Sequence, residues 1–221
     1  MGLNHSPKIV MDSITGYFDA ENPKLGTGQI LDLTHQQPIG GNIIKITLTN
    51  TTYVSTTPKC YTFNGNTTTA TIQSYPNFVG NSTTDYTIEI MLRPTNLTGE
   101  RCILKDAFGD FDLTFNNNQI SLNYYGDVTS FSSPSTLTTG NWYHIVFINA
   151  SSSVSAYCNG IYQGTASIAI FQDIGSWRIG NGNYSADKFV GDFGFFRSYS
   201  KILSATEVLQ NFNALRGRFG L

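Results

Sequence analysis

Three aspartates in one short segment are the side chains of this chain best placed for acid–base chemistry. Asp110 and Asp112 are separated by one residue, and Asp106 lies just upstream. Retaining hydrolysis of a glycosidic bond uses two carboxyl groups about 5–5.5 Å apart, one as nucleophile and one as acid. Residues i and i+2 of a strand meet that need. However, the aspartates alternate with apolar Leu113 and Phe115, so we favour the polar outer face of a strand over a catalytic pair.

Sugar recognition is the second chemistry for which suitable side chains occur. An exposed aromatic ring can stack on the C–H face of a sugar, while a neighbouring amide or carboxylate bonds the sugar hydroxyls. Two turn-like segments combine such residues, and the candidates are Tyr124, Tyr125, Asp127, Asn181, Asn183 and Tyr184. The alternative is that these tyrosines cap a sheet edge and the asparagines shape turns, and the sequence favours this alternative.

The histidines and cysteines do not predict a further catalytic group. His144 lies between Tyr143 and Ile145 in a predicted core strand, so a half-buried or exposed imidazole is expected there in place of a base. Each cysteine lies in a strand-like run with no histidine nearby in the sequence. The three are therefore predicted to be buried free thiols, which fits synthesis in a reducing cytoplasm, and they are Cys60, Cys102 and Cys158.

The composition predicts one domain with a neutral polar surface. The chain has 221 residues, of which 13% are charged, and its formal net charge is -2. A single β-sandwich or barrel reaches this length, and a net charge near zero argues against nucleic-acid binding. The sequence contains no apolar run long enough to cross a membrane. Its start lacks the basic and apolar stretches of a secretory signal.

Alternating apolar and polar residues recur along the chain and predict strands. Residues 86–92 place four apolar side chains on one face, and 141–148 is the strongest predicted strand. Residues 110–124 predict a hairpin that turns at Asn116–Asn118, and 154–164 predict a second hairpin that turns at Asn159–Gly160. Further strands are predicted at 16–20, 42–46, 60–65, 177–180 and 189–197. Short strands about ten residues apart predict an all-β fold, a two-sheet antiparallel sandwich.

The C-terminal segment contains the one predicted helix. Ser204 and Glu207 have the spacing of a capping box, which marks the first turn of a helix. Val208, Phe212 and Leu215 follow at i, i+4 and i+7 and form one apolar face. We therefore expect a short helix that ends at Leu215.

These elements divide the chain into three parts. Residues 1–15 are expected to form an N-terminal arm and the first strand, 16–215 the β-sandwich, and 216–221 a C-terminal tail. No internal repeat and no linker is evident, so we expect a single domain.

The order of several motifs resembles that of a laminin-G-like, concanavalin-A-like jelly-roll domain. The motifs are Phe63–Gly65, Tyr86–Pro94, Asn141–Val146, Tyr157–Gly160, Arg178–Gly180, Gly191–Gly194 and Leu203–Ser204. The segments Tyr17–Lys24 and Glu207–Phe219 also resemble the two ends of laminin-G-like proteins in the virions of marine tailed phages. The resemblance implies a jelly-roll sandwich that serves as a virion structural protein on the capsid or in the tail.

The same resemblance implies that calcium has to be considered, because many laminin-G-like domains bind it at one rim of the sandwich. Calcium takes about six to eight oxygen ligands, mostly from carboxylates and carbonyls. In those domains the last strand often carries two acidic residues where this chain has Gly194 and Phe195, and this difference argues against a bound metal. The remaining candidate ligands are Asp19, Asp32, Asp187 and Asp192.

The expected function is non-enzymatic docking onto a phage capsid or tail protein, with several copies assembling as a homo-oligomer. Phe195 and Phe196 are adjacent in a strand and point to opposite faces, so one ring must meet the final helix or a partner subunit. Arg218 and Phe219 of the predicted tail are candidate anchors in that interface. The alternative function is a glycan-binding adhesin that recognises host surface polysaccharide, and a glycosidase is the third and weakest reading.

Overall fold

The computed structural model describes residues 7–22, 28–34, 45–73, 85–106, 111–124, 127–131, 136–151, 153–167, 176–181 and 187–221. The strands are β1 (Ile14–Asp19), β2 (Gln29–Leu31), β3 (Lys45–Thr49), β4 (Thr52–Val54), β5 (Cys60–Asn64), β6 (Thr69–Gln73), β7 (Tyr86–Pro94), β8 (Glu100–Asp106), β9 (Phe111–Asn116), β10 (Gln119–Tyr124), β11 (Asp127–Phe131), β12 (Tyr143–Ala150), β13 (Ser153–Cys158), β14 (Ile161–Ser167), β15 (Ser176–Ile179) and β16 (Val190–Tyr199). The helix is α1 (Ala205–Phe219). Among these described residues, no helix is both long enough and apolar enough to span a membrane.

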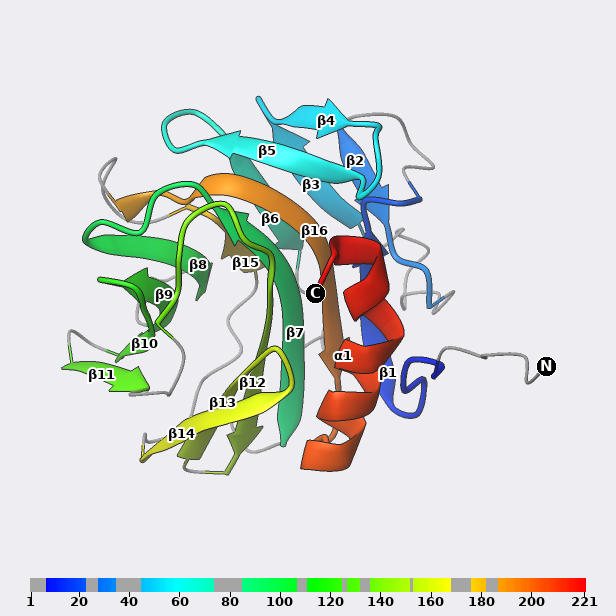
Figure 1. Cartoon of the computed structure of the whole chain (residues 1–221), viewed down its shortest axis with the longest axis vertical. Coiled ribbons are helices and arrows are strands. Elements are labelled where there is room, and N and C mark those ends of the chain that lie inside the picture. The colour runs from blue at the N-terminus through cyan, green and yellow to red at the C-terminus, as the bar shows by residue number, and fades with distance from the viewer. Residues whose placement is uncertain are drawn as a thin grey trace.

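The strands form two antiparallel sheets that pack face to face (Figure 1). Sheet A has the order β14-β13-β12-β7-β16-β5-β4, and β1 pairs with the second half of β16. Sheet B has the order β11-β10-β9-β8-β15-β6-β3-β2. The predicted all-β sandwich of two antiparallel sheets with one C-terminal helix is confirmed.

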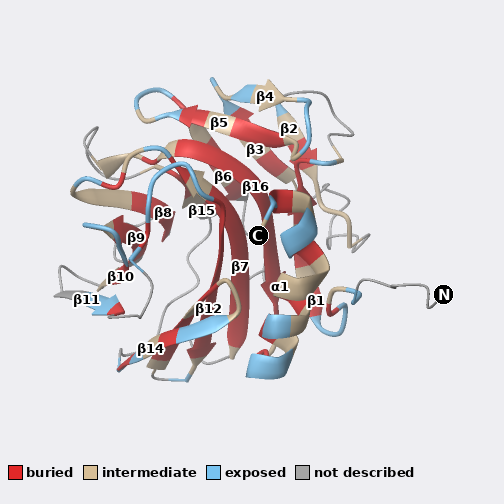
Figure 2. Cartoon of the chain, in the orientation of Figure 1, coloured by how far each residue is buried: buried red, intermediate tan, exposed pale blue. Residues whose placement is uncertain are grey.

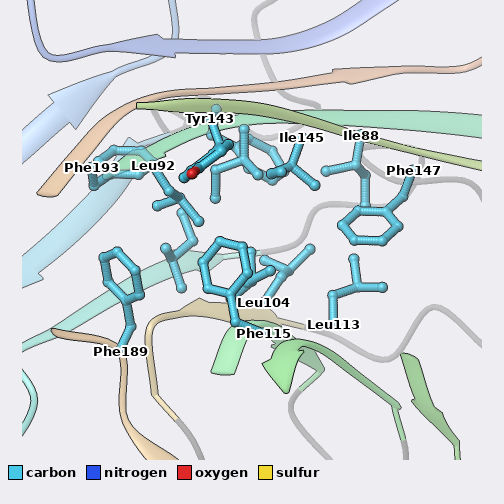
Figure 3. Close-up of a cluster of buried hydrophobic side chains, with 14 of the residues drawn as sticks. Ile88, Leu92, Leu104, Leu113, Phe115, Tyr143, Ile145, Phe147, Phe189 and Phe193 are labelled. Carbon is cyan, nitrogen blue, oxygen red and sulfur yellow. The ribbon is translucent and has the colours of Figure 1, made fainter. Parts of the chain in front are cut away.

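The apolar core lies between the two sheets (Figure 3). Ile88 and Phe147 of sheet A point toward Leu113 and Phe115 of sheet B, and all four are at most 2% exposed. The four apolar side chains that alternate along residues 86–92 all belong to this core, as the pattern predicts. Burial of this continuous apolar surface holds the two sheets together.

The two predicted hairpin turns are also confirmed. Asn159 and Gly160 both have a positive φ, 50° and 78°, between β13 and β14. Asn117 and Asn118 also have a positive φ, 46° and 68°, between β9 and β10. A two-residue hairpin turn needs positive φ at both central positions, which asparagine and glycine adopt most easily.

Helix α1 starts as predicted but ends later. The Ser204 side chain accepts a hydrogen bond from the Glu207 backbone, and the Glu207 carboxylate accepts one from the Ser204 backbone, so the capping box is present. The helix continues to Phe219, four residues beyond the predicted end at Leu215. The predicted tail is therefore mostly helical, because Gly220, with φ of 71°, supplies the left-handed cap that ends the helix.

Helix α1 packs on the outer face of sheet A (Figure 1). As a result, β7 and β16 are buried on both faces along nearly their whole length (Figure 2). The buried stripe of the helix includes Val208 and Leu215, as predicted, whereas Phe212 is only half-buried. The helix instead buries the side chain of Asn211, and this buried amide was not predicted.

Candidate functional site

A row of polar residues crosses the outer face of sheet B, with one residue from each of seven neighbouring strands, β10 to β2. In spatial order the row is Asn123, Asp112, Lys105, Arg178, Thr71, Thr47 and Gln29. These residues face away from the core, because successive side chains of a strand point to opposite faces and their neighbours belong to the core. This face is therefore one candidate surface for a polar ligand.

An ion pair occupies the middle of this row. The Lys105 ammonium lies 2.7 and 2.9 Å from the two carboxylate oxygens of Asp112, and both residues are buried. Asp112 thus lies on the outer face, as its alternation with Leu113 predicts, and its carboxylate is held by a cation. Asp106 ends β8, and Asp110 lies outside the described residues.

The structure does not bring the six sugar-recognition candidates together where it describes them. Tyr124 and Asp127 face each other across β10 and β11, at the level of Phe111 in the neighbouring strand. Asn181 follows β15, which β9 and β8 separate from β10 in sheet B, and the N–H of its neighbour Gly180 bonds to the Ile103 carbonyl. The remaining three candidates lie outside the described residues, and they are Tyr125, Asn183 and Tyr184.

Two of the four calcium candidates are held by arginines. Asp19 accepts a 2.8 Å hydrogen bond from Arg218, and Asp192 accepts one of 2.8 Å from Arg93. Both carboxylates are almost fully buried, at 3% and 5% exposure. A carboxylate neutralised by an arginine is a poor ligand for calcium, which binds most strongly to uncompensated negative oxygens.

The other two calcium candidates lie elsewhere. Asp32 accepts hydrogen bonds from the backbone of Tyr17 and from Thr34, while Asp187 lies near Glu100. Burial raises the pKa of Glu100, and the negative charge of Asp187 adds to that rise. In the described part of the chain, no three acidic, histidine or cysteine side chains gather as a metal site.

The four docking candidates are internal contacts. Phe196 belongs to the core between the sheets, and Phe195 packs beneath α1, so both faces of β16 are covered within one chain. Phe219 is 5% exposed because its ring lies against Trp142, with 4.8 Å between the ring centres. Arg218 is committed to its ion pair with Asp19. The expectation that Arg218 and Phe219 lie in a tail after the helix is wrong, because the helix extends through both.

A buried polar cluster lies between sheet A and α1, and the sequence did not predict it. Glu89 of β7 accepts hydrogen bonds from Asn211 at 2.8 Å and from Tyr199 at 3.2 Å, and pairs with Arg197 at 3.3 Å. His144 places Nε2 3.4 Å from the same carboxylate. Its imidazole is fully buried, not half-buried or exposed as expected, because it stacks on Phe212 of α1, with 6.1 Å between the ring centres. The one available signal was Asn211, three residues after Val208 on the apolar face of the helix.

The stability of the protein should fall in acid because of Glu89. Burial favours the protonated carboxyl, but His144, Arg197 and Asn211 outweigh this and lower the pKa of Glu89 below its ordinary value. Such a group stabilises the fold fully above the ordinary glutamate pKa, and this contribution is lost as pH falls through the lowered pKa. Urea unfolding measured from pH 7 to pH 3 should show this loss, and it should be smaller in a variant that lacks Glu89. An equal loss in both proteins would contradict the assignment.

The three cysteines are free and buried, as predicted. Burial raises the pKa of the Cys60 and Cys158 thiols to about 12, and it also raises the pKa of Cys102. A protonated thiol is a poor nucleophile. These side chains therefore serve packing and not covalent chemistry.

Comparison with known families identifies the type of domain. The family model Laminin_G_3, described as the concanavalin A-like lectin/glucanases superfamily, matches residues 64–209. A search of curated proteins by sequence gave no match.

Solved structures share the fold at low sequence identity. The binding domain of Paraclostridial Mosquitocidal Protein 1 is 17% identical, with a TM-score of 0.72, and the match covers 92% of this chain and 52% of that one. The binding domain of botulinum neurotoxin DC, solved in complex with rat synaptotagmin II, is 12% identical, with a TM-score of 0.71 and coverage of 93% and 52%. This chain thus spans about half the length of both toxin binding domains.

A third structure is matched along almost its whole length. It is domain 4 of AbnA, a GH43 extracellular arabinanase from Geobacillus stearothermophilus, solved in complex with arabinotriose. It is 16% identical, with a TM-score of 0.68, and the match covers 90% of this chain and 98% of that one. At such identities the similarity shows the fold alone.

Proposed function

Because this chain belongs to the concanavalin A-like lectin/glucanases superfamily, we propose that it is a non-enzymatic binding domain displayed on the particle of a tailed phage. Its partner there is a capsid or tail protein, which it meets through protein–protein contacts. The similar structures support a binding role, since they include toxin binding domains and a domain in complex with arabinotriose.

The observation that carries the non-enzymatic part is the pairing of carboxylates with cations on the outer faces of the sandwich. The pairs are Asp112 with Lys105, Asp192 with Arg93, Glu89 with Arg197 and Asp19 with Arg218. Each of these carboxylates is held by a cationic side chain of the same chain, so we assign it to the fold and not to a bound substrate. These ion pairs stabilise the fold, and we infer that the uncharged surfaces contact the binding partner.

The assignment to a phage particle is supported by the two segments that resemble virion proteins. Tyr17–Lys24 and Glu207–Phe219 are far apart in the sequence, yet Asp19 and Arg218 join them by an ion pair at 2.8 Å. The described part of the first segment, 17–22, therefore contacts the second segment in the fold.

Purified particles of the phage that encodes the chain provide the test of this proposal. We expect the chain to co-purify with intact particles through a density gradient, and an antibody against it to label either the capsid or the tail. Its absence from particles would contradict the virion role. Release of reducing ends from host polysaccharide by the purified chain would contradict the non-enzymatic role.

Recognition of host surface polysaccharide is the second candidate function. The observation that favours it is Tyr162 on the edge strand β14, whose side chain is 51% exposed. An exposed aromatic ring on a neutral strand is suited to stack on a sugar.

A further inference from the structure

The outer face of the β13–β14 hairpin is lined by hydroxyl-bearing side chains in three facing pairs. The pairs are Ser153 with Ser167, Ser155 with Thr165, and Tyr157 with Tyr162. We call these six side chains the hydroxyl face. The residues between them point the other way, so Val154, Ala156 and Ala166 belong to the core. The hydroxyl face lies at the edge of sheet A, where β14 is the last hydrogen-bonded strand among the described residues (Figure 1).

The exposed half of this face is held in a fixed arrangement. Tyr162 packs against the Tyr157 ring at 5.5 Å between ring centres, and its phenol oxygen lies 2.7 Å from the Thr165 hydroxyl. That hydroxyl lies 2.6 Å from the Ser155 hydroxyl. The edge-strand members Tyr162, Thr165 and Ser167 are exposed, whereas the members on β13 are half-buried. A ligand would therefore meet one aromatic ring and a connected set of hydroxyls whose positions are set in advance.

The surrounding sequence is uncharged. No Asp, Glu, Lys or Arg occurs from Val128 to Gln172, a segment that includes β12, β13 and β14. Protein partners commonly use complementary charges to fix orientation and to exclude other proteins. A face of hydroxyls and one ring, on two strands that carry no charged residue, instead matches the hydroxyls and C–H faces of a neutral sugar.

We propose that the hydroxyl face binds a short uncharged oligosaccharide. The ring of Tyr162 stacks on a sugar C–H face, and the hydroxyls of Thr165, Ser155 and Ser167 exchange hydrogen bonds with sugar hydroxyls. From Ser153 to Tyr157 the strand rises about 14 Å, at about 3.4 Å per residue, which is long enough for several sugar rings. This inference rests on the proposal that the chain is a binding domain, and it names the site for the second candidate function.

Ligand-observed NMR with neutral oligosaccharides tests the site. The probes are arabinotriose, maltotriose, cellotriose and neutral fragments of bacterial O-polysaccharide, each titrated into the full chain. We expect at least one probe to bind, and Tyr162→Ala to weaken its binding at least tenfold. Tyr162→Phe keeps the ring and should retain most of the affinity, while Thr165→Ala should lose part of it. The matched control is Thr52→Ala, which removes an exposed hydroxyl from β4 at the opposite edge of sheet A.

Each outcome decides the inference separately from the virion role. Binding that Tyr162→Ala and Thr165→Ala leave unchanged would overturn the site, even if the chain is a lectin. Absence of binding by every probe at millimolar concentration would overturn the oligosaccharide ligand, while incorporation into particles would still decide the proposed function. If Tyr162→Ala blocks incorporation and no probe binds, the face docks a protein and the inference fails. Thermal unfolding of each variant shows whether it is folded.

Discussion

Replacement of Glu89 by alanine is expected to lower the free energy of unfolding by about 3–5 kcal/mol. Glu89 is fully buried, and its carboxylate is the common partner of Arg197, Asn211 and Tyr199. Without it, the guanidinium of Arg197 remains buried beneath α1 with no counter-charge. Typical domains have only about 5–15 kcal/mol of stability, so urea unfolding followed by circular dichroism should show a large shift of the midpoint.

Two control variants distinguish the destabilisation caused by an unpaired buried charge from the destabilisation caused by losing any carboxylate. Glu21→Ala removes one partner of an exposed pair with Lys59, at 3.2 Å, and should cost less than about 1 kcal/mol. Combining Glu89→Leu with Arg197→Met removes both buried charges, and it should recover part of the stability that Glu89→Ala loses. If Glu89→Ala is no more destabilising than Glu21→Ala, the buried cluster does not hold α1 on the sheet.

The sandwich was predictable because apolar alternation is a local signal. Ile88 and Ile90 face the core because their strand has a period of two, and Asn159–Gly160 turns because both residues tolerate positive φ. Neither inference needs knowledge of distant residues. The same period of two places Glu89, between the two isoleucines, on the face away from the core.

The polar cluster was not predictable because it depends on where α1 lies. Glu89 is buried only because a helix more than a hundred residues later covers the outer face of β7. Asn211 carried the one local sign, but a single asparagine on an apolar helix face does not reveal its partner. The predicted end at Leu215 was wrong, because the helix continues through Gly217 to Phe219 and its left-handed cap is Gly220.

The hydroxyl face could be predicted only in part, for the same reason. Ser153, Ser155 and Tyr157 alternate with apolar residues, so their shared face was readable from the sequence. Which strand forms the edge of sheet A depends on the order of strands that are distant in the chain. Tyr162 therefore became a candidate only when β14 was seen at that edge.

Replacement of Phe219 by alanine is expected to lower the free energy of unfolding by about 3–5 kcal/mol. Its ring fills the space between Trp142 and Phe195, with 4.8 and 6.1 Å between ring centres. A Cβ added at Gly194 would lie 2.8 Å from the ring, so the strand comes close to it at a position with no side chain. Unfolding in urea, followed by tryptophan fluorescence, measures the loss.

The matched control for Phe219 lies on the same helix. Leu209 is 46% exposed, so Leu209→Ala should change stability by no more than about 0.5 kcal/mol. Equal unfolding midpoints for the two variants would show that Phe219 is not a structural anchor.

The expected difference in stability also determines how a docking experiment has to be designed. A truncation that removes Phe219 weakens the contact between α1 and sheet A, so its failure to join particles would report a loss of folding and not a lost interface. Exposed positions such as Tyr162 and Leu209 test attachment without that ambiguity, because neither one supports the core.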